Sequence, residues 1–413
     1  MVYPYSTGRE LGPALAQAGL GAIAVRPADP SALGMTGPPL DPAAWWQVVT
    51  DPGDLGELAG TLPDVSWVLP GDESGVPVAE ELADKLGRPG NDPRTTGART
   101  RKTDMQEALY RAGVPGPETC RATTIGQVRS AASRIGYPVV LKPDWSSSSV
   151  GVTVCYSPAA LTVAAGQLLG SRGALGEVTR AIAVQERLTG SKWTVDTVTA
   201  PGPDGRPAHK ITSVWQERVI EHCGHFAWGE SWLVAPADLA AITDPQALRV
   251  IAYTHRVLDA TGVVWGPACT ELVLTSTGPR LTEVMARLAG CYPVHLVENV
   301  TGQSQVTATV DLLTNPAALA SREPAAGDGR AVAQAWLAAP HAGWLNGAEL
   351  QQIRDLPTVQ AISPGLQADA EVEETTDSPT SPGRLDLCGP PAAVQQDIEA
   401  IRALEQTLYR RHR

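Results

Sequence analysis

In the first part of the chain, short apolar runs alternate with longer segments in which apolar positions recur at helical spacing. Residues 22–25 and 66–70 form apolar runs of strand length, and apolar positions recur at helical spacing over residues 76–86. Such alternation of strands and helices is typical of a small parallel sheet covered by helices. We therefore expect an N-terminal α/β domain, followed by a polar connector that is rich in Arg and Thr.

The next segment contains two predicted helices and a predicted hairpin. The helices cover residues 103–112 and 124–135, and each is followed by a glycine, a common helix end. Residues 137–143 form an almost continuous apolar run, which predicts a buried strand. Four serines and a glycine then lead into a second strand over residues 152–155, so the two strands form a hairpin with a flexible tip.

Strands dominate the pattern expected for the second half of the chain. Residues 215–236 have no clear period and are expected to be irregular, whereas a helix begins at Pro245 and continues through Leu258. An acidic stretch rich in Pro and Ser, residues 368–383, is expected to be a solvated loop. Further strands are expected at residues 182–186, 193–199, 271–274, 280–284, 331–337 and 384–388, with helices at 347–355 and from Pro391.

Charge and composition narrow the class of protein. The chain has 32 Lys and Arg against 44 Asp and Glu, a net charge of −12, so it has no general attraction to nucleic acid or anionic lipid. No stretch approaches the roughly 18 apolar residues of a membrane helix, and the first residues lack a secretory signal. Six cysteines lie far apart, which favours reduced thiols. We expect a cytoplasmic protein with no nucleic-acid and no membrane partner.

Two lysines lie where lysines are rare. Lys142 is inside the apolar run of residues 137–143, where an ammonium group is costly to bury unless an anion meets it. Lys102 begins a helix, and the Ser/Gly hairpin after Lys142 offers unhindered backbone N–H groups that suit phosphate oxygens. These features favour a polyphosphate ligand, although a lysine that reaches from a strand end to solvent gives the same pattern at Lys142.

Two glutamates lie on neighbouring predicted strands joined by a short turn. A hairpin there can bring the carboxylates of Glu271 and Glu283 to one face. Carboxylate oxygens on rigid strands suit Mg²⁺, with phosphate and water as the remaining ligands. Arg287 follows Glu283 by four residues and would place a cationic fork beside the metal. The alternatives are that the glutamates face solvent and that Arg287 only pairs with a nearby carboxylate.

The order of these parts resembles that of the ATP-grasp superfamily. Lys102 is followed by PVVLKP with its Gly/Ser loop, by VQERLTGSKWTVD and by GPACTELVLTSTGPRLTEVMARLAG, whose end is similar to the E-x-x-A-R-[FL]-A-G stretch of L-amino-acid ligases. The resemblance implies an α/β (mixed α+β) ATP-grasp fold with a small N-terminal parallel α/β domain, a lid subdomain, a central antiparallel sheet and a small C-terminal domain. The implied boundaries are residues 1–95, 96–188, 189–325 and 326–413.

The resemblance also implies roles for individual residues. Two lysines would contact the phosphates of ATP, and the serine-rich loop would close over the phosphates as a lid. The segment around residues 185–188 would bind the adenine. Arg287 and Gly290 would face the reacting carboxyl group. The implied ATP-binding residues are Lys102, Lys142, Ser147, Ser148, Ser149, Gly151, Gln185, Glu186, Leu188 and Lys192, and the implied Mg²⁺ ligands are Glu271 and Glu283.

Three positions depart from the family pattern. Lys192 stands where a glutamate usually contacts the ribose, Met285 where many members have a metal-binding asparagine, and Cys269 where related ligases often have histidine. A thioether is a poor ligand for Mg²⁺, so we expect the two glutamates and phosphate to coordinate the metal. Candidates for the substrate pocket are Glu217, His225, Trp228, Glu230 and Cys291.

The sequence thus predicts an ATP-dependent carboxylate–amine ligase that joins an amino acid to a second amino acid or a small amine through an acyl phosphate, releasing ADP and phosphate. The expected cofactors are ATP and Mg²⁺, the expected partners are small-molecule carboxylates and amines, and a homodimer is a family-level expectation. Two alternatives stay open. One is an ATP-grasp carboxylase or a carboxylate ligase with a non-amine nucleophile, and the other is a nucleotide-binding protein whose catalysis has decayed.

Overall fold

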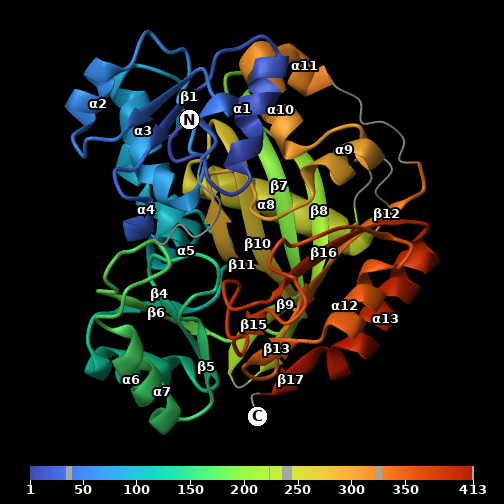
Figure 1. Cartoon of the computed structure of the whole chain (residues 1–413). Coiled ribbons are helices and arrows are strands. Elements are labelled where there is room, and N and C mark those ends of the chain that lie inside the picture. Colours follow the sequence, from blue (N-terminus) through green and yellow to red (C-terminus); the bar gives the residue numbers. More distant parts are fainter. Residues whose placement is uncertain (34–39, 223, 235–243, 322–327, 412–413) are drawn as a thin grey trace.

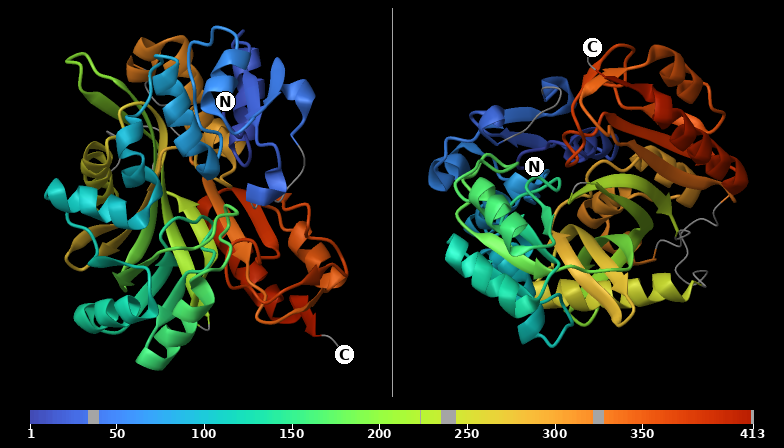
Figure 2. Two further views of the ribbon diagram at one scale, coloured as in Figure 1. Left: turned by 90° about the vertical axis from the view of Figure 1, so that its left-hand side faces the viewer. Right: turned by 90° about the horizontal axis from the view of Figure 1, so that it is seen from below.

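The computed structural model describes residues 1–33, 40–222, 224–234, 244–321 and 328–411. A long central sheet runs through the molecule, and Figure 1 shows the N-terminal unit at the upper left, a smaller sheet at the lower left and the C-terminal unit at the lower right. Figure 2 shows the same units from two other sides. Among the described helices, none combines the length and the apolar character that crossing a membrane requires. The mixed α/β architecture confirms the fold class predicted from the sequence.

The central sheet has eight strands, and every neighbouring pair is antiparallel. Their spatial order is β11-β10-β7-β8-β9-β12-β16-β14. Since the last three strands belong to the C-terminal unit, that unit extends the central sheet. The bounds are β7 Ser191–Pro201, β8 Pro207–His222, β9 His225–Leu233, β10 Gly266–Thr275, β11 Gly278–Met285, β12 Ala331–Leu337, β14 Val359–Ile362 and β16 Gly383–Gly389.

Helix α8 covers one face of the central sheet. It spans Pro245–Thr261, and Asp244 caps its first turn by accepting a hydrogen bond from the backbone N–H of Gln246. Gly262 ends the helix in the left-handed conformation, with φ of 70°. Helix α8 packs with helix α5, Lys102–Arg111, against the sheet to form a hydrophobic core.

Strand β7 shows why the two faces of the sheet differ. Trp193 and Val195 are fully buried in the core beneath α8. Lys192, Thr194 and Asp196 alternate with them along the strand and therefore point to the opposite face. One face of the sheet thus builds a core, and part of the other face carries polar side chains.

The opposite face is covered at one end by helices from distant parts of the chain. Helices α1, Gly8–Gln17, and α10, Gln305–Thr314, pack there with Val198 and Ala200 of β7. Helix α9, Val294–Thr301, packs against neighbouring strands of the same sheet. The polar residues of β7 lie beyond the end that these helices cover.

A smaller antiparallel sheet carries the serine-rich hairpin. Its strand order is β3-β6-β4-β5, and two helices pack around the buried side chains of Val139 and Leu141. Thr124 caps the first of these helices by accepting a hydrogen bond from the N–H of Gln127, in agreement with its predicted start. The bounds are β3 Thr119–Ala122, α6 Ile125–Ile135, β4 Val139–Pro143, β5 Thr153–Cys155, α7 Pro158–Leu168 and β6 Ile182–Glu186.

The N-terminal unit contains a small parallel sheet. Strand β1 pairs in parallel with β2, and Val2 forms parallel bridges to Val25 and Pro70. The strand predicted over residues 66–70 is therefore wrong in extent, since within this segment only Pro70 forms a bridge. The bounds are β1 Ile23–Arg26, β2 Gln47–Thr50, α2 Leu55–Thr61, α3 Val76–Lys85 and α4 Gly97–Thr100.

The C-terminal unit adds helices and a three-stranded sheet to β12, β14 and β16. Helix α13, Pro391–Leu408, packs with helix α12, Gly347–Arg354, over these strands and buries Leu385 and Leu387. The small sheet has the order β15-β13-β17. The remaining bounds are α11 Pro316–Ser321, β13 Gly343–Leu345, β15 Glu371–Val372 and β17 Tyr409–Arg411.

The expectation that residues 215–236 are irregular is wrong. Most of them form β8 and β9, a long antiparallel pair in which Glu217 lies opposite Ser231 and Arg218 opposite Glu230. Polar side chains occupy both faces of this pair, so apolar and polar positions do not alternate in the sequence. Residues 235 and 236 lie outside the described residues.

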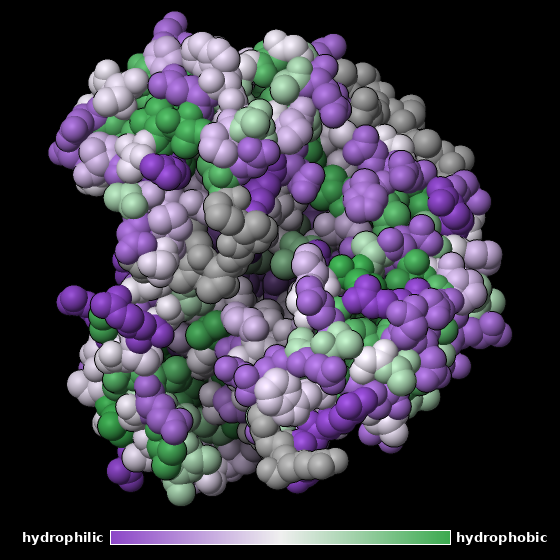
Figure 3. Space-filling model, in the orientation of Figure 1, coloured by the Kyte–Doolittle hydropathy of each residue, from purple (hydrophilic) through white to green (hydrophobic). Residues whose placement is uncertain are grey.

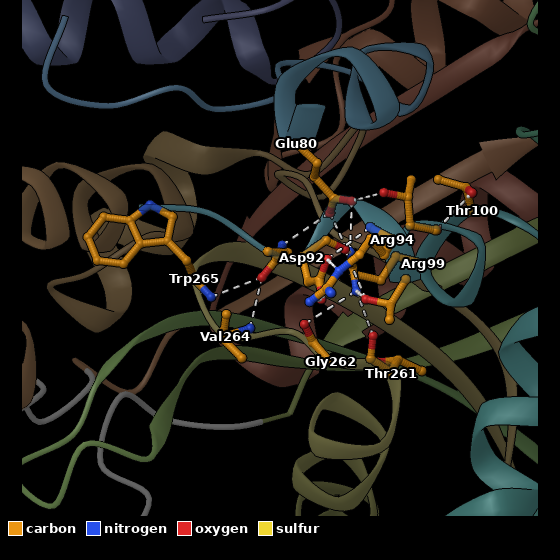
Figure 4. A network of polar contacts seen from close by, with 12 residues as sticks. Glu80, Asp92, Arg94, Arg99, Thr100, Thr261, Gly262, Val264 and Trp265 are labelled. Carbon is orange, nitrogen blue, oxygen red and sulfur yellow. Dashed lines mark hydrogen bonds and ion pairs between the residues drawn. The ribbon is translucent and has the colours of Figure 1, made fainter. Parts of the chain in front are cut away.

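A buried ion pair joins the N-terminal unit to the end of α8 (Figure 4). The guanidinium of Arg99 is fully buried, and its Nε and Nη2 donate to the two carboxylate oxygens of Glu80 at 2.7 and 2.8 Å. Its Nη1 donates to the carbonyl oxygen of Thr261 at 2.8 Å. Asn91 adds a second link, because its Oδ1 accepts from the N–H of Val264 at 2.8 Å. Removing either charge would leave its partner unpaired in the interior.

We predict that Glu80→Ala lowers the free energy of unfolding by about 3–5 kcal/mol, because it leaves the buried guanidinium of Arg99 without an opposite charge. Urea denaturation followed by circular dichroism measures this loss. Glu81→Ala, which removes an exposed carboxylate from the same helix, is the matched control and should change stability by less than about 0.5 kcal/mol. Equal effects of the two substitutions would contradict the role given to this ion pair.

Candidate active site

Two adjoining cavities open on the polar face of the central sheet. The first cavity, of about 390 Å³, lies between the smaller sheet and the central sheet. The second cavity, of about 1080 Å³, lies where the N-terminal unit, the central sheet and the C-terminal unit meet. In the space-filling view, the face shown is hollowed near its centre (Figure 3). Both cavities are lined by Ser147, Ser149, Val150, Glu271 and Glu283, which therefore form their junction.

Three lysines reach the first cavity from three different elements. Lys102 comes from the start of α5, Lys142 from β4 and Lys192 from β7. The Nζ of Lys142 donates to Oε1 of Gln185 at 2.8 Å, so its partner is a neutral amide. Burial, followed by the like charge of Lys102, lowers the pKa of Lys142 to about 8.

Two glutamates lie directly opposite each other at the junction. Glu271 of β10 pairs with Glu283 of β11, and the next pair is Leu272 with Leu281, so the register shifts by one residue. The extra residue, Thr282, forms a bulge that lets both carboxylates face the cavities while both leucines stay in the core. The local sequence therefore places two acidic groups side by side on rigid strands.

Each of these carboxylates is met by a lysine. The Nζ of Lys102 donates to Oε1 of Glu283 at 2.7 Å and to the carbonyl oxygen of Ser146 at 3.0 Å. The Nζ of Lys192 lies 2.8 Å from Oε2 of Glu271. Burial alone would lower the pKa of Lys102, but Glu283 outweighs it and raises the pKa. Burial alone would raise the pKa of Glu271, but Lys192 outweighs it and lowers the pKa, so both pairs are ionic.

Lys192 has two further neighbours. Its Nζ lies 3.6 Å from the ring centre of Trp228 and 3.8 Å from Oε2 of Glu217. The other carboxylate oxygen of Glu217 accepts hydrogen bonds from Thr194 at 2.8 Å and from the hydroxyl of Tyr292 at 2.6 Å. Burial raises the pKa of Glu217 to about 7. The ammonium of Lys192 is thus held between two carboxyl groups and an aromatic face.

Arg287 follows β11 and reaches the second cavity. Its Nε donates to Oε2 of Glu73 at 3.0 Å, and its Nη1 donates to the carbonyl oxygen of Leu288 at 2.7 Å. Burial alone would lower the pKa of Arg287, but Glu73 outweighs it and raises the pKa. Burial raises the pKa of Glu73 to about 7. Arg287 is therefore a charged group with a fixed orientation at the cavity wall.

The C-terminal unit supplies another wall of the second cavity. Cys291 is exposed there with φ of 68°, a left-handed conformation that costs a residue with a Cβ about 1–2 kcal/mol. Gln334 of β12 supports this turn, because its Nε2 donates to the carbonyl oxygen of Cys291 at 2.8 Å and to Oδ1 of Asp386 at 2.7 Å. Beside them, the guanidinium carbon of Arg384 lies 5.5 Å from the ring centre of Trp336.

The tip of the serine-rich hairpin lies at the junction. Ser148 and Ser149 have positive φ values of 58° and 60°, so the turn is tight. The backbone N–H of Ser378, from the C-terminal unit, donates to the carbonyl oxygen of Ser148 at 3.1 Å. The loop of residues 368–383 is therefore not merely solvated as expected, because it contacts the hairpin tip and lines the second cavity at Ser378 and Pro379.

The structure brings most of the predicted site residues to the two cavities. The first cavity is lined by Lys102, Lys142, Ser147, Ser149, Gln185, Glu186, Leu188, Lys192, Glu217, Glu271 and Glu283. The second cavity is lined by Ser147, Ser148, Ser149, Trp228, Glu271, Glu283, Arg287, Gly290 and Cys291. Residues that are far apart in the sequence thus meet around one junction.

Three predicted residues do not line either cavity. Glu230 ion-pairs with Arg218 at 3.0 Å and with Arg402 at 3.2 Å, so its carboxylate ties β9 to its neighbours. His225 lies at the start of β9, outside both walls. Gly151 lies behind the hairpin tip with φ of 76°, and a Cβ there would come within 2.7 Å of Leu168. Glycine at this position serves the close packing of the hairpin.

Glu73, which lines the second cavity, and the nearby Asp196 of β7 were not anticipated from the sequence. Glu73 has its partner Arg287 at a distance of 214 positions in the chain, so no local pattern identifies it. Asp196 is buried on the same face of β7 as Lys192 and accepts a hydrogen bond from Ser213 at 2.5 Å. Burial raises the pKa of Asp196 to about 6. A charged residue inside an apolar strand is the signal that singled out Lys142, and it could have singled out Asp196 too.

The donor set of the junction fits a magnesium ion that is shared with a ligand. Glu271 and Glu283 present hard carboxylate oxygens side by side, which suits Mg²⁺. Two positions further along the same strands, Cys269 lies opposite Met285, and their sulfur atoms are poor ligands for this ion. No cluster of three or more His, Cys, Asp or Glu in the described residues could hold a metal by itself. Phosphate oxygens would have to complete the coordination.

Known proteins that are similar in sequence include a synthase and a ligase. Dapdiamide A synthase of Enterobacter agglomerans is 26% identical over 351 residues, which cover 84% of this chain and 80% of that protein. Alanine–anticapsin ligase of Bacillus subtilis is 35% identical over 74 residues, 18% of this chain and 16% of that protein. No protein-family model matches the chain.

Solved structures match the chain over its full length. The L-amino acid ligase from Bacillus licheniformis has a TM-score of 0.75 at 16% identity, covering 100% of this chain and 98% of that chain. A carboxyaminoimidazole ribonucleotide synthase from Aspergillus clavatus, complexed with ATP, has a TM-score of 0.68 at 14% identity and covers 98% of both chains. These matches show that the chain has the fold of the L-amino acid ligase, and the order of its motifs resembles that of the ATP-grasp superfamily.

Proposed function

We propose that the chain is an ATP-dependent ligase that forms an amide bond between an amino acid and a second amino acid or a small amine. ATP occupies the first cavity, and the two organic substrates occupy the second. The observation that carries this proposal is the junction, since Glu271, Glu283 and the hairpin tip belong to the walls of both cavities. The names of the alanine–anticapsin ligase and of the L-amino acid ligase support the same class of reaction.

The lining of the first cavity suits a nucleotide in one orientation. The segment from Glu186 to Gly190 connects the smaller sheet to the central sheet and offers backbone groups and the apolar side chain of Leu188 to the adenine. The lysines lie toward the glutamates of the junction, as the Lys102–Glu283 contact of 2.7 Å requires. The triphosphate therefore points to the second cavity.

The first chemical step activates the carboxylate substrate. A carboxylate resists attack by an amine because it is anionic and has no good leaving group. Transfer of the γ-phosphoryl group of ATP to a carboxylate oxygen gives an acyl phosphate and ADP. Lys102, Lys142 and the backbone of the hairpin tip stabilise the phosphate charges by position and electrostatics. Glu271 and Glu283 would hold Mg²⁺, which supplies further positive charge at the phosphates when it is bound.

The second step forms the amide. The amine nitrogen attacks the acyl carbon, inorganic phosphate leaves with the electrons of the broken C–O bond, and the proton lost by the amine passes to the leaving phosphate. The guanidinium of Arg287, oriented by Glu73, stabilises the oxygen that carries negative charge in the tetrahedral intermediate. The hairpin tip, which Ser378 contacts at Ser148, closes over the junction and keeps water from the acyl phosphate.

The test of this proposal is phosphate release from ATP over a panel of amino acids and amines, with mass spectrometry of the products. We expect release only when a carboxylate and an amine are both present, and a product mass equal to their sum less one water. Glu283→Ala should abolish release, while Glu57→Ala, which removes an exposed carboxylate on α2, should leave it unchanged.

Two outcomes of this screen would contradict the proposal. Release of ADP that depends on bicarbonate and needs no amine would favour the carboxylase alternative. Binding of ATP without release for any pair would favour a nucleotide-binding protein that has lost catalysis.

Nucleotide affinity should depend on pH through Lys142. Its pKa of about 8 means that the ammonium is mostly charged at pH 7 and mostly neutral at pH 9, so affinity for the phosphates falls as the pH rises. We predict that the dissociation constant of a fluorescent ATP analogue increases about tenfold over this range. Lys142→Arg, which stays charged, should show a much flatter dependence. A flat profile for the unmodified protein would contradict this role of Lys142.

Cys291 should influence which side chains the second cavity accepts. It is exposed in the cavity directly after Gly290, and its small side chain leaves room next to the reacting carboxyl group. We predict that Cys291→Trp lowers kcat/KM for amino acids with large side chains at least about tenfold relative to glycine and alanine. Cys291→Ser is the control of similar size. An unchanged ratio in the tryptophan variant would place the substrate side chain elsewhere.

A further inference from the structure

The contacts of Lys192 raise the question of how many metal ions the site can hold. Its ammonium lies 2.8 Å from Glu271, 3.8 Å from Glu217 and 3.6 Å from the ring centre of Trp228. Lys192 thus occupies space beside Glu271 that a metal ion bound to Oε2 of this carboxylate would need. The side chain is only 19% exposed, so little water surrounds the pair.

The register of the strands places Lys192 beside Glu271 and Glu217. Lys192 lies opposite Glu217 in the β7–β8 pair, and Glu271 lies opposite Thr194 in the β10–β7 pair. Lys192 and Thr194 are two residues apart and point to the same face, so all three charged groups meet on one side of the sheet. Burial alone would lower the pKa of Lys192, but Glu271 and Glu217 outweigh it and raise the pKa.

While Lys192 is in place, the carboxylates leave few oxygens for two divalent cations. Mg²⁺ at phosphates prefers near-octahedral oxygen geometry, which phosphate oxygens, water and one or two carboxylates complete, so a second ion would need free carboxylate oxygens beside the first. The junction offers the carboxylates of Glu271 and Glu283, while Cys269 and Met285 present sulfur two positions away on the same strands. Each carboxylate already has one oxygen paired with a lysine, at 2.8 Å for Glu271 and 2.7 Å for Glu283.

We propose that the ammonium of Lys192 takes the place of a second magnesium ion, so that the ATP-bound protein contains one divalent cation. The ammonium supplies positive charge next to Glu271 without requiring other ligands, and Trp228 and Glu217 hold it there. The other carboxylate oxygens of Glu271 and Glu283 are left for the single metal ion. This inference rests on the proposed binding of ATP in the first cavity.

Manganese counting tests the proposal without measuring catalysis. The full chain is kept in excess over a non-hydrolysable ATP analogue so that all of the analogue is bound, and the complex is titrated with Mn²⁺ while electron paramagnetic resonance reports the free ion. We expect one Mn²⁺ per complex in the unmodified protein. Lys192→Gln removes the charge beside Glu271 and should increase the count to two. Lys192→Arg retains a cation and should keep the count at one.

Each outcome decides the question. Two Mn²⁺ ions in the unmodified protein, or one in Lys192→Gln, would overturn the proposal, as would two in Lys192→Arg. Circular dichroism and the affinity for the analogue verify that each variant is folded and binds nucleotide. Failure of the unmodified protein to bind the analogue at all would overturn the proposed function itself and this inference with it. A count of one that persists without any ligase activity would leave the metal inference standing and reject only the reaction.

Discussion

The neutralisation of buried charges by partners from other parts of the chain is the constraint on which the site depends. An ionised side chain loses several kcal/mol when it leaves water, and it recovers this only beside an opposite charge in good geometry. Glu283 is met by Lys102 at 2.7 Å, Glu271 by Lys192 at 2.8 Å and Glu73 by Arg287 at 3.0 Å. Two of these pairs link different structural units, so the charges can be buried only when the N-terminal unit, α5 and the central sheet have come together.

The sequence predicts those parts of the site whose signal is local. Lys142 is visible as a charge inside an apolar strand, and the two glutamates are visible as acidic residues on two strands joined by a turn. The order of the motifs then identifies the fold, which the full-length match to an L-amino acid ligase confirms. What a local pattern cannot contain is a partner far away in the chain, and for that reason Glu73 was missed although it orients Arg287.

The same reason explains the errors about the C-terminal half of the chain. Residues 215–236 look irregular because one face of the β8–β9 pair serves the site and the other is also partly polar, so the alternation that marks a strand disappears. The acidic loop of residues 368–383 looks solvated because nothing in its sequence reveals that Ser378 meets Ser148. In both cases the polar residues are explained by a contact that only the folded chain creates.

Comparison of the three lysines separates the effect of burial on the pKa of an ammonium group from the effect of the side chain that it contacts. All three side chains lie in the first cavity, and burial alone would lower the pKa of each. The pKa is nevertheless raised for Lys102 and Lys192, which contact carboxylates, and lowered only for Lys142, which contacts the neutral amide of Gln185. The charge of Lys142 is therefore the least compensated of the three. A phosphate that binds beside Lys142 therefore gains the strongest electrostatic attraction. A phosphate beside Lys102 or Lys192 competes with a glutamate that already pairs with the lysine.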